Sequence, residues 1–211
     1  HPQQAILALK QSQAVFFDFD GTLYTGDSVD DLAAFLGKYD AMSQITKEVM
    51  GGDISMEDAL DMTAHLLEVT KEDVDRFVNT HEVKWSEGVD ELIAYLKAQG
   101  KVLYVVSGSV EDICIPWCKR FGIDKNHIVC NRFLYDESGK CVGFDYSALT
   151  SHNGGKEKVI RDVCDRYGYE KRVIIGDGIT DLEAKPAVDA FIGYYGNEYR
   201  ERVQNEADLS V

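Results

Sequence analysis

The sequence is short of positive charge. It has 22 lysines and arginines against 37 aspartates and glutamates, which gives a formal net charge of −15 at pH 7. Nucleic acids and anionic membranes bind proteins through basic surfaces, so this balance argues against both as partners. A small anionic substrate remains compatible with it, because a cluster of aspartates that binds Mg²⁺ becomes locally positive.

Long apolar runs and paired cysteines are also lacking. No run approaches the roughly 18 apolar residues of a membrane-spanning helix. The start at His1 and Pro2 has no basic segment followed by an apolar one, as a signal peptide would, and the missing methionine suggests a trimmed or engineered end. The five cysteines are odd in number and form no Cys-x-x-Cys pair, which argues against a disulfide framework. We therefore expect a cytoplasmic protein.

A length of 211 residues suits one well-formed core. Apolar segments typical of strands, at residues 14–18, 102–106, 173–176 and 190–193, alternate with amphipathic segments typical of helices. The predicted helices are at about residues 89–99, 110–121 and 156–167, and Pro116 predicts a kink or a late start in the second. This alternation predicts an α/β fold, a Rossmann-like parallel sheet with helices on both faces.

Residues 27–82 interrupt the alternation, because they contain no convincing strand. Three capping-box patterns begin amphipathic runs there, at Ser28–Asp31, Ser55–Asp58 and Thr70–Asp73. We expect a small helical cap, which would cover the end of the first strand and exclude water. The predicted domains are an α/β core of residues 1–26 and 83–211 and a cap of residues 27–82. Residues 131–146 predict a β-hairpin.

Two carboxylates directly follow the first predicted strand. Asp18 and Asp20 are two residues apart, so along an extended segment they point the same way. They stand at the carboxyl end of the strand, where open α/β sheets bind their ligands. Burying two acids together without a partner is costly, so a cation or a phosphoryl group between them is the better explanation. The pair therefore indicates metal-assisted phosphate chemistry.

Three further polar clusters follow predicted strands or begin a helix. They are Ser107-Gly108-Ser109, Gly154-Gly155-Lys156 and Gly176-Asp177-Gly178-Ile179-Thr180-Asp181. A serine hydroxyl with free backbone N–H groups can bind phosphate oxygens, and a lysine at a helix start can neutralise them. Each cluster alone also fits an ordinary turn or a solvated helix start. Independent turns do not explain all four clusters in this order.

The four clusters resemble the motifs of the haloacid-dehalogenase-like phosphatases, and the similarity narrows to the phosphoserine phosphatase family. It runs from about Ala14 to Tyr199. The further matching segments are Met50-Gly51-Gly52, Asn131-Arg132, Gly154 to Lys158, Gly176 to Ala184 and Ala190 to Gly193. The resemblance implies a Mg²⁺-dependent phosphomonoester hydrolase that converts O-phosphoserine to serine and phosphate.

The resemblance also implies a covalent mechanism. Asp18 would be the nucleophile that forms an aspartyl-phosphate. Asp20 would protonate the leaving alkoxide and then take a proton from the hydrolytic water, which requires a raised pKa. Ser107, the Gly108 N–H and Lys156 would neutralise the phosphoryl oxygens.

A Mg²⁺ site is implied by the same resemblance. Its ligands would be Asp18, the backbone carbonyl of Asp20 and Asp177. Asp181 would bind water on the metal or the Lys156 ammonium. Such a set of oxygen ligands suits Mg²⁺.

Substrate selection is expected to come from the cap. The resemblance places Asp27 at the position for the substrate ammonium and Met56 at a bulky apolar position above the substrate, with Thr180 as a further contact. Thr63 departs from the family, which has an arginine there for the substrate carboxylate. Threonine cannot form that bidentate pair. It fits equally well as a packed residue on an apolar helix face.

Three alternatives to a phosphoserine phosphatase stay open. The missing arginine motivates a phosphatase of another small monoester, such as phosphoethanolamine. A non-catalytic phosphate-binding protein of the same fold is the second, although the presence of all four motifs speaks against it. An aspartyl-phosphate could also be passed to an acceptor alcohol in place of water. The expected partner is in each case a small phosphorylated metabolite, and the oligomeric state is not predicted.

Overall fold

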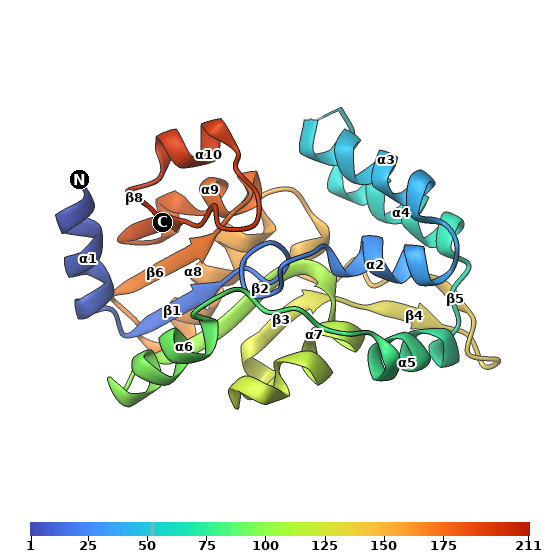
Figure 1. Ribbon diagram of the computed structural model, residues 1–211, viewed down its shortest axis with the longest axis horizontal. Helices are drawn as coiled ribbons and strands as arrows, with labels where there is room; N and C mark the ends of the chain where they lie inside the picture. Colours follow the sequence, from blue (N-terminus) through green and yellow to red (C-terminus); the bar gives the residue numbers. More distant parts are fainter. Residues whose placement is uncertain (52) are drawn as a thin grey trace.

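The computed structural model describes residues 1–51 and 53–211, without the side chain of Met50, so Gly52 of the Met50-Gly51-Gly52 match lies outside the described residues. Six strands form one parallel sheet in the order β3-β2-β1-β6-β7-β8 (Figure 1). The strands are β1 (Ala14–Phe17), β2 (Val102–Val110), β3 (Ile128–Asn131), β6 (Arg172–Gly176), β7 (Ala190–Gly193) and β8 (Leu209–Ser210). This is a doubly wound order, in which the direction of winding reverses beside β1.

Helices cover both faces of the sheet. They are α1 (Pro2–Gln11), α6 (Val89–Ala98) and α7 (Glu111–Cys118) on one face, and α8 (Gly155–Tyr167), α9 (Ile179–Glu183) and α10 (Glu201–Glu206) on the other. In β1, Val15 and Phe17 pack on the first face, whereas Ala14 and Phe16 pack on the second. A strand that is buried on both sides must be apolar throughout, which explains the continuous run at the start of the chain. The predicted α/β fold is confirmed.

The predicted strand and helix boundaries differ from the observed ones at β2 and at α7. Strand β2 continues to Val110 and so includes Ser107-Gly108-Ser109, which the sequence placed after the strand. A register shift between Val106 and Val110 marks this stretch as irregular, as at a β-bulge. Helix α7 begins one residue later than predicted and ends two residues after Pro116. The sequence patterns predicted no element for α1, β3, β8, α9 or α10, and all of these except α1 are short.

Four helices occupy most of residues 28–80: α2 (Ser28–Phe35), α3 (Tyr39–Gly51), α4 (Met56–Leu67) and α5 (Lys71–Thr80). The capping box predicted at Ser28 is wrong, because Asp27 is the N-cap of α2 and accepts from the Asp30 N–H at 2.8 Å. Ser55 caps α4 with one hydrogen bond from the Asp58 N–H. At α5 the Thr70–Asp73 box is complete.

A two-stranded antiparallel hairpin, β4 (Phe133–Tyr135) and β5 (Cys141–Phe144), extends beside the inserted helices (Figure 1). It confirms the predicted hairpin within narrower bounds, since Asn131 belongs to β3. The hairpin contacts the inserted segment through the backbone, because the Cys141 N–H donates to the carbonyl of Val69, between α4 and α5, at 2.8 Å. No helix in the described part of the chain is long and apolar enough to cross a membrane.

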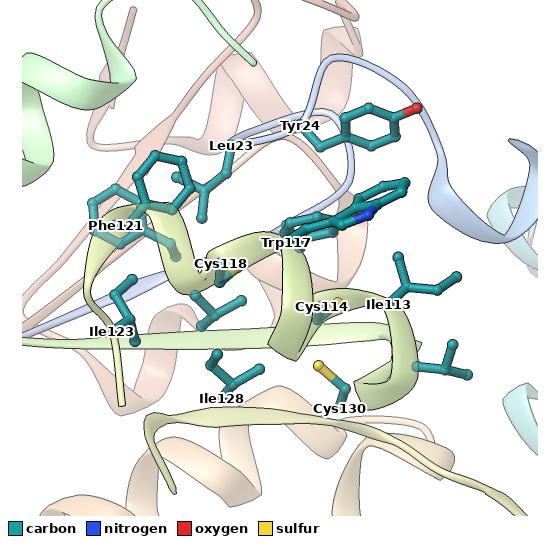
Figure 2. Close-up of a cluster of buried hydrophobic side chains, with 14 of the residues drawn as sticks. Leu23, Tyr24, Ile113, Cys114, Trp117, Cys118, Phe121, Ile123, Ile128 and Cys130 are labelled. Carbon is teal, nitrogen blue, oxygen red and sulfur yellow. The ribbon is translucent and has the colours of Figure 1, made fainter. Parts of the chain in front are cut away.

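The two segments that connect the sheet to the inserted helices lie side by side. The Thr25 N–H donates to the Lys84 carbonyl at 3.0 Å, and Tyr24 forms an isolated bridge with Trp85. Beneath them the ring of Tyr24 lies over Trp117, with ring centroids 5.3 Å apart (Figure 2). Cys114, Cys118 and Cys130 fill the same buried cluster as free thiols (Figure 2). The connection therefore rests on a packed apolar base.

Candidate active site

The charged residues of the candidate site meet where the winding of the sheet reverses. Asp18 follows β1 and Asp177 follows the neighbouring strand β6. The Asp18 N–H donates to the Ile175 carbonyl at 2.9 Å, so the end of β1 is still attached to β6 at this point. Gly21 allows the close approach of the two loops, since it has φ +73° and a Cβ there would lie 2.4 Å from Asp177 Oδ2. The side chains of Asp18 and Asp177 are both buried.

Lys156 joins two of these carboxylates. Its Nζ lies 2.9 Å from Asp18 Oδ1 and 2.7 Å from Asp181 Oδ1, and all three side chains are buried. Helix α8 supplies the lysine from its first turn, and α9 supplies Asp181, which also accepts from the Gly178 N–H at 3.0 Å. Hydrogen bonds from both sides leave Asp181 little freedom, so it fixes the position of the lysine.

The carboxyl groups of the site differ in the direction of their pKa shifts. Burial would raise the pKa of Asp18, but the charge of Lys156 and the hydrogen bonds to the Asp18 carboxyl group together outweigh burial, so this pKa lies below its ordinary value. Burial and then the charge of Asp18 raise the pKa of Asp177 to about 7. The same two causes raise the pKa of Asp181 well above its ordinary value, against the opposing effect of Lys156. Asp18 is thus the group held as a carboxylate.

This donor set fits a hard divalent cation. Asp18, Asp177 and Asp181 each offer a carboxylate oxygen, and these oxygens lie within 4.8 Å of one another in a buried position. Repulsion by Asp18 adds to burial in raising the pKa values of Asp177 and Asp181, and a cation among the three carboxyl groups would relieve that repulsion. Ligands that are all oxygens suit Mg²⁺.

Asp20 lies on the other side of Asp18, toward the cap. Its Oδ1 accepts from the Ser28 N–H at 2.8 Å, at the first residue of α2. Burial, followed by the charge of Asp27, raises the pKa of Asp20 well above its ordinary value. Burial and Asp30 likewise raise the pKa of Asp27 to about 7. A carboxyl group that holds its proton near neutral pH is what a general acid requires.

The predicted phosphate-binding residues form the opposite wall. Ser107 is buried, and its Oγ accepts from the Ser109 N–H at 3.0 Å. Asn131 supports this segment by donating its Nδ2 hydrogen to the Gly108 carbonyl at 3.0 Å, and Thr150 donates in turn to Asn131 at 2.8 Å. The segment Ser107 to Ser109 of β2 is therefore held by a side chain of β3 as well as by a hydrogen bond of its own.

One cavity of about 770 Å³ contains nearly all of the predicted site residues. Its lining includes the predicted set Asp18, Asp20, Asp27, Met56, Thr63, Ser107, Gly108, Lys156, Asp177 and Thr180. Asp181 does not line it and is fully buried. The cavity thus spans the end of the sheet and the inserted helices.

The inserted helices give this cavity an apolar roof. Most of the described residues that α2, α3 and α4 contribute are apolar: Val29, Met42, Ile45, Val49, Met56, Ala59 and Leu60. Thr63 is buried and donates its hydroxyl to the Ala59 carbonyl at 2.7 Å, so its hydrogen is already used within the helix. The described roof residues include no lysine or arginine.

Contacts at the rim hold α4 against the core. The Met56 N–H donates to Asn153 Oδ1 at 3.0 Å. His152 Nδ1 lies 2.5 Å from Glu57 Oε1, and its Nε2 lies 2.8 Å from the Tyr146 carbonyl oxygen. Both partners are acceptors only, so the two hydrogen bonds together require the doubly protonated imidazolium. The Tyr146 carbonyl and then Glu57 raise the pKa of His152 accordingly.

Arg200 also lines the cavity and was not predicted from the sequence. Its Nη1 donates to Asp177 Oδ2 at 2.5 Å and to the Asp177 carbonyl at 3.1 Å, and its Nη2 lies 2.7 Å from Glu198 Oε2. His152 and Asn153 were missed as well. None of the three belongs to a motif, and only the folded chain brings them to the cavity.

Comparison with known proteins agrees with this geometry. Residues 15–184 match the family model of the haloacid dehalogenase-like hydrolases. The phosphoserine phosphatase of Drosophila melanogaster is 34% identical over 211 residues, which cover 100% of this chain and 78% of that protein. A solved phospho-aspartyl intermediate analogue of phosphoserine phosphatase has a TM-score of 0.82 at 25% identity and covers 95% of this chain and 93% of its own. The structure of DsGPDH of Dunaliella salina has a TM-score of 0.86 at 30% identity, over 100% of this chain and 36% of its own.

Proposed function

The chain belongs to the haloacid dehalogenase-like hydrolases and, within them, to the phosphoserine phosphatase family, and we propose that it hydrolyses O-phosphoserine to serine and phosphate through an aspartyl-phosphate. The observation that carries the proposal is the buried group of Asp18, Lys156, Asp177 and Asp181 at the end of β1 and β6. A phosphomonoesterase needs a nucleophile, a cation and a proton donor in one cavity, and this group together with Asp20 supplies residues for each.

Asp18 is the proposed nucleophile. It is the carboxylate with the lowered pKa, and one of its oxygens, Oδ1, is held both by Lys156 and by the Phe19 N–H at 2.7 Å. With Oδ1 fixed, Oδ2 is the oxygen left to attack phosphorus. The new bond joins Oδ2 to phosphorus while the bond from phosphorus to the serine oxygen breaks. Hydrolysis of the aspartyl-phosphate then returns Asp18 and releases phosphate.

Asp20 is the proposed general acid and base. Its raised pKa keeps a proton on the carboxyl group, which passes to the serine oxygen as that oxygen leaves phosphorus. The resulting carboxylate then accepts a proton from the attacking water in the second step. Asp18 and Asp20 stand in one segment, yet their surroundings shift their pKa values in opposite directions.

The remaining core residues orient and neutralise the phosphoryl group. Lys156, the Ser107 hydroxyl and the Gly108 N–H are the proposed contacts of its oxygens. Asp181 keeps the lysine in place, and Thr22 donates its hydroxyl to Asp177 Oδ1 at 3.0 Å.

Mg²⁺ fits beside these residues. Asp18, Asp177 and the Asp20 backbone carbonyl would hold it, with Asp181 behind them, and when bound it would supply positive charge to the phosphoryl oxygens. Binding has a readout of its own, because a ligand of the native state raises the unfolding temperature. We expect Mg²⁺ to raise the melting temperature of the wild type and to raise it much less in Asp177→Asn. An equal rise in both would contradict the site.

The cap is proposed to select the alcohol part of the substrate. Asp27 would accept the ammonium of phosphoserine, whose positive charge would lower the raised pKa of Asp27. Met56 and Thr180 line the same cavity. The division into a core of residues 1–26 and 83–211 and a cap of residues 27–82 is part of this proposal, supported by the paired connecting segments near Thr25 and Lys84. The free thiols further suit a reducing compartment such as the cytosol.

A monoester without a carboxylate is a second candidate, and the cap itself favours it. The described roof residues contribute no lysine or arginine, and Thr63 has its hydroxyl bonded within α4. Arg200 and Arg202 also line the cavity, but Arg200 is bonded to Asp177 and Glu198, and Arg202 is bonded to Glu206. Phosphoethanolamine keeps the ammonium for Asp27 and lacks the carboxylate.

A substrate panel at fixed Mg²⁺ distinguishes the candidates. We expect phosphate release from O-phosphoserine with a higher kcat/KM than from phosphoethanolamine. The reverse order would replace the first candidate by the second. If phosphate is released from neither ester and from no other small monoester, the remaining candidate is a phosphate-binding protein without catalytic activity. Product analysis with an added alcohol measures transfer in place of hydrolysis.

A further inference from the structure

Two buried serine hydroxyls join the cap to the core beside the proposed proton donor. Ser28 is the first residue of α2, and Ser109 lies in β2. Their Oγ atoms are 2.5 Å apart, and the two residues are 0% and 2% exposed. At that distance one hydroxyl donates to the other, and burial makes the loss of either partner costly.

Each serine makes a second contact through its own backbone N–H. That of Ser28 donates to Asp20 Oδ1 at 2.8 Å, and that of Ser109 donates to Ser107 Oγ at 3.0 Å. The hydroxyl pair therefore completes a chain of contacts from the proposed proton donor to the proposed phosphate-binding hydroxyl. One half belongs to the cap and the other to the core.

The direction of the Ser28 N–H depends on where α2 begins. Asp27 caps the helix through the Asp30 N–H, which leaves the N–H of Ser28, at the first turn, to Asp20. A small shift of this helix end would turn the N–H away from Asp20. The contact with Ser109 ties the helix end to β2, the strand that also carries Ser107.

We propose that Ser28 and Ser109 are positioning residues, which hold the Asp20 carboxyl group and the Ser107 hydroxyl in register so that Asp20 faces the leaving oxygen of the bound ester. The inference rests on the proposed function, because it assigns the pair a part in proton transfer. It adds a requirement that the four motifs do not reveal: protonation of the leaving oxygen depends on the contact of α2 with β2.

The test compares two esters that differ in their need for a proton. An alkyl phosphate such as O-phosphoserine or phosphoethanolamine releases a basic alkoxide, whereas p-nitrophenyl phosphate releases a stable anion that leaves without protonation. We expect Ser109→Ala and Ser28→Ala to lower kcat for the alkyl ester by about tenfold, which is a part of the rate enhancement that general acid catalysis contributes. For p-nitrophenyl phosphate we expect kcat to fall by less than about threefold. Ser12→Ala is the matched control, since its hydroxyl is buried and bonded to Leu9 at 2.7 Å at the opposite end of β1.

Two further variants separate positioning from stability. The double variant Ser28→Ala/Ser109→Ala should lose no more than either single one, because both remove the same contact. In an Asp20→Asn background, Ser109→Ala should have no further effect on the alkyl ester. Thermal unfolding of each variant shows which are folded, and Ser109→Ala alone serves if Ser28→Ala does not fold.

The outcomes distinguish this inference from the proposed function. If the wild type releases phosphate from neither kind of ester, the proposed function fails. If the wild type is active and the variants lose equally on both esters, or lose nothing, the pair has only a structural role and the inference is overturned. Additive losses in the double variant would overturn it as well.

Discussion

The two walls of the cavity are built by different means. The core wall consists of charged groups with little exposure, such as Lys156 at 7% and Asp177 at 4%, and each is held by more than one short contact. The cap wall is mainly apolar, and its links to the core at the rim run through half-buried or exposed residues such as His152 and Glu57. Charge interactions in a buried site depend steeply on position, whereas apolar contact is non-directional. This contrast suits a core that determines the reaction and a cap that adapts to the substrate.

The largest effect should follow from removing the nucleophile in the core wall. Asp18→Asn keeps the shape of the side chain but cannot form the aspartyl-phosphate, so we expect kcat to fall by roughly 10⁴-fold or more. Steady-state phosphate release measures it. Asp90→Asn is the matched control, because Asp90 is exposed and pairs with Arg120 away from the cavity. Activity that survives Asp18→Asn would remove the covalent mechanism.

The next largest effect concerns the stability of the core wall. Lys156→Ala would leave Asp18 and Asp181 buried without their shared cation, so we expect the free energy of unfolding at neutral pH to fall by roughly 3–5 kcal/mol. Urea denaturation measures this change. Lys71→Ala, which breaks an exposed pair with Asp75, should cost about 1 kcal/mol or less. Similar losses in both variants would show that the buried charges are no more tightly coupled than surface ones.

A new charge in the cap wall should change the choice of substrate without changing the chemistry. Thr63→Arg introduces a guanidinium into the apolar roof, where it can bind a carboxylate in a bidentate manner. We expect the kcat/KM ratio of phosphoserine to phosphoethanolamine to rise by roughly 10- to 100-fold, the value of one charge-assisted hydrogen bond. Thr63→Val is the control for removing the hydroxyl alone. An unchanged ratio would mean that the substrate carboxylate does not face this position.

The smallest effect should come from the rim. The pKa of His152 is raised in the folded protein, so its contact with Glu57 and the Tyr146 carbonyl is complete below the ordinary imidazole pKa of about 6.5 and is lost as the pH rises through the raised value. Lys158, the neighbouring cation, opposes this shift.

We therefore expect the KM of the wild type to rise by about two- to threefold over that interval, as α4 detaches from the core. In His152→Ala this rise should be absent. His65→Ala is the control, because His65 lies on α4 and, among the residues that the structure describes, bonds within the helix, to the Asp61 carbonyl. A pH dependence that is the same in all three proteins would exclude the rim contact as its cause.

Patterns of short range were predictable from the sequence. The alternation of strands and helices, the inserted helices and the hairpin all follow from local periodicity and turn residues, and the structure has them. Boundaries were less predictable, as at Ser28, where Asp27 outcompetes the predicted serine cap. Strand β8 has only two residues, Leu209 and Ser210, which is too short for a periodic signal.

The sequence by itself determined which groups are candidates for the chemistry, because Asp18, Asp20, Lys156 and Asp177 stand beside strand ends and helix starts that local pattern reveals. Only the tertiary structure decided their protonation states and their supporting contacts. The pKa of a carboxyl group depends on burial and on neighbours that are distant in the chain, as Lys156 is from Asp18. Arg200 beside Asp177, His152 beside Glu57 and Ser109 beside Ser28 are likewise contacts of folded surfaces, and no local pattern encodes them.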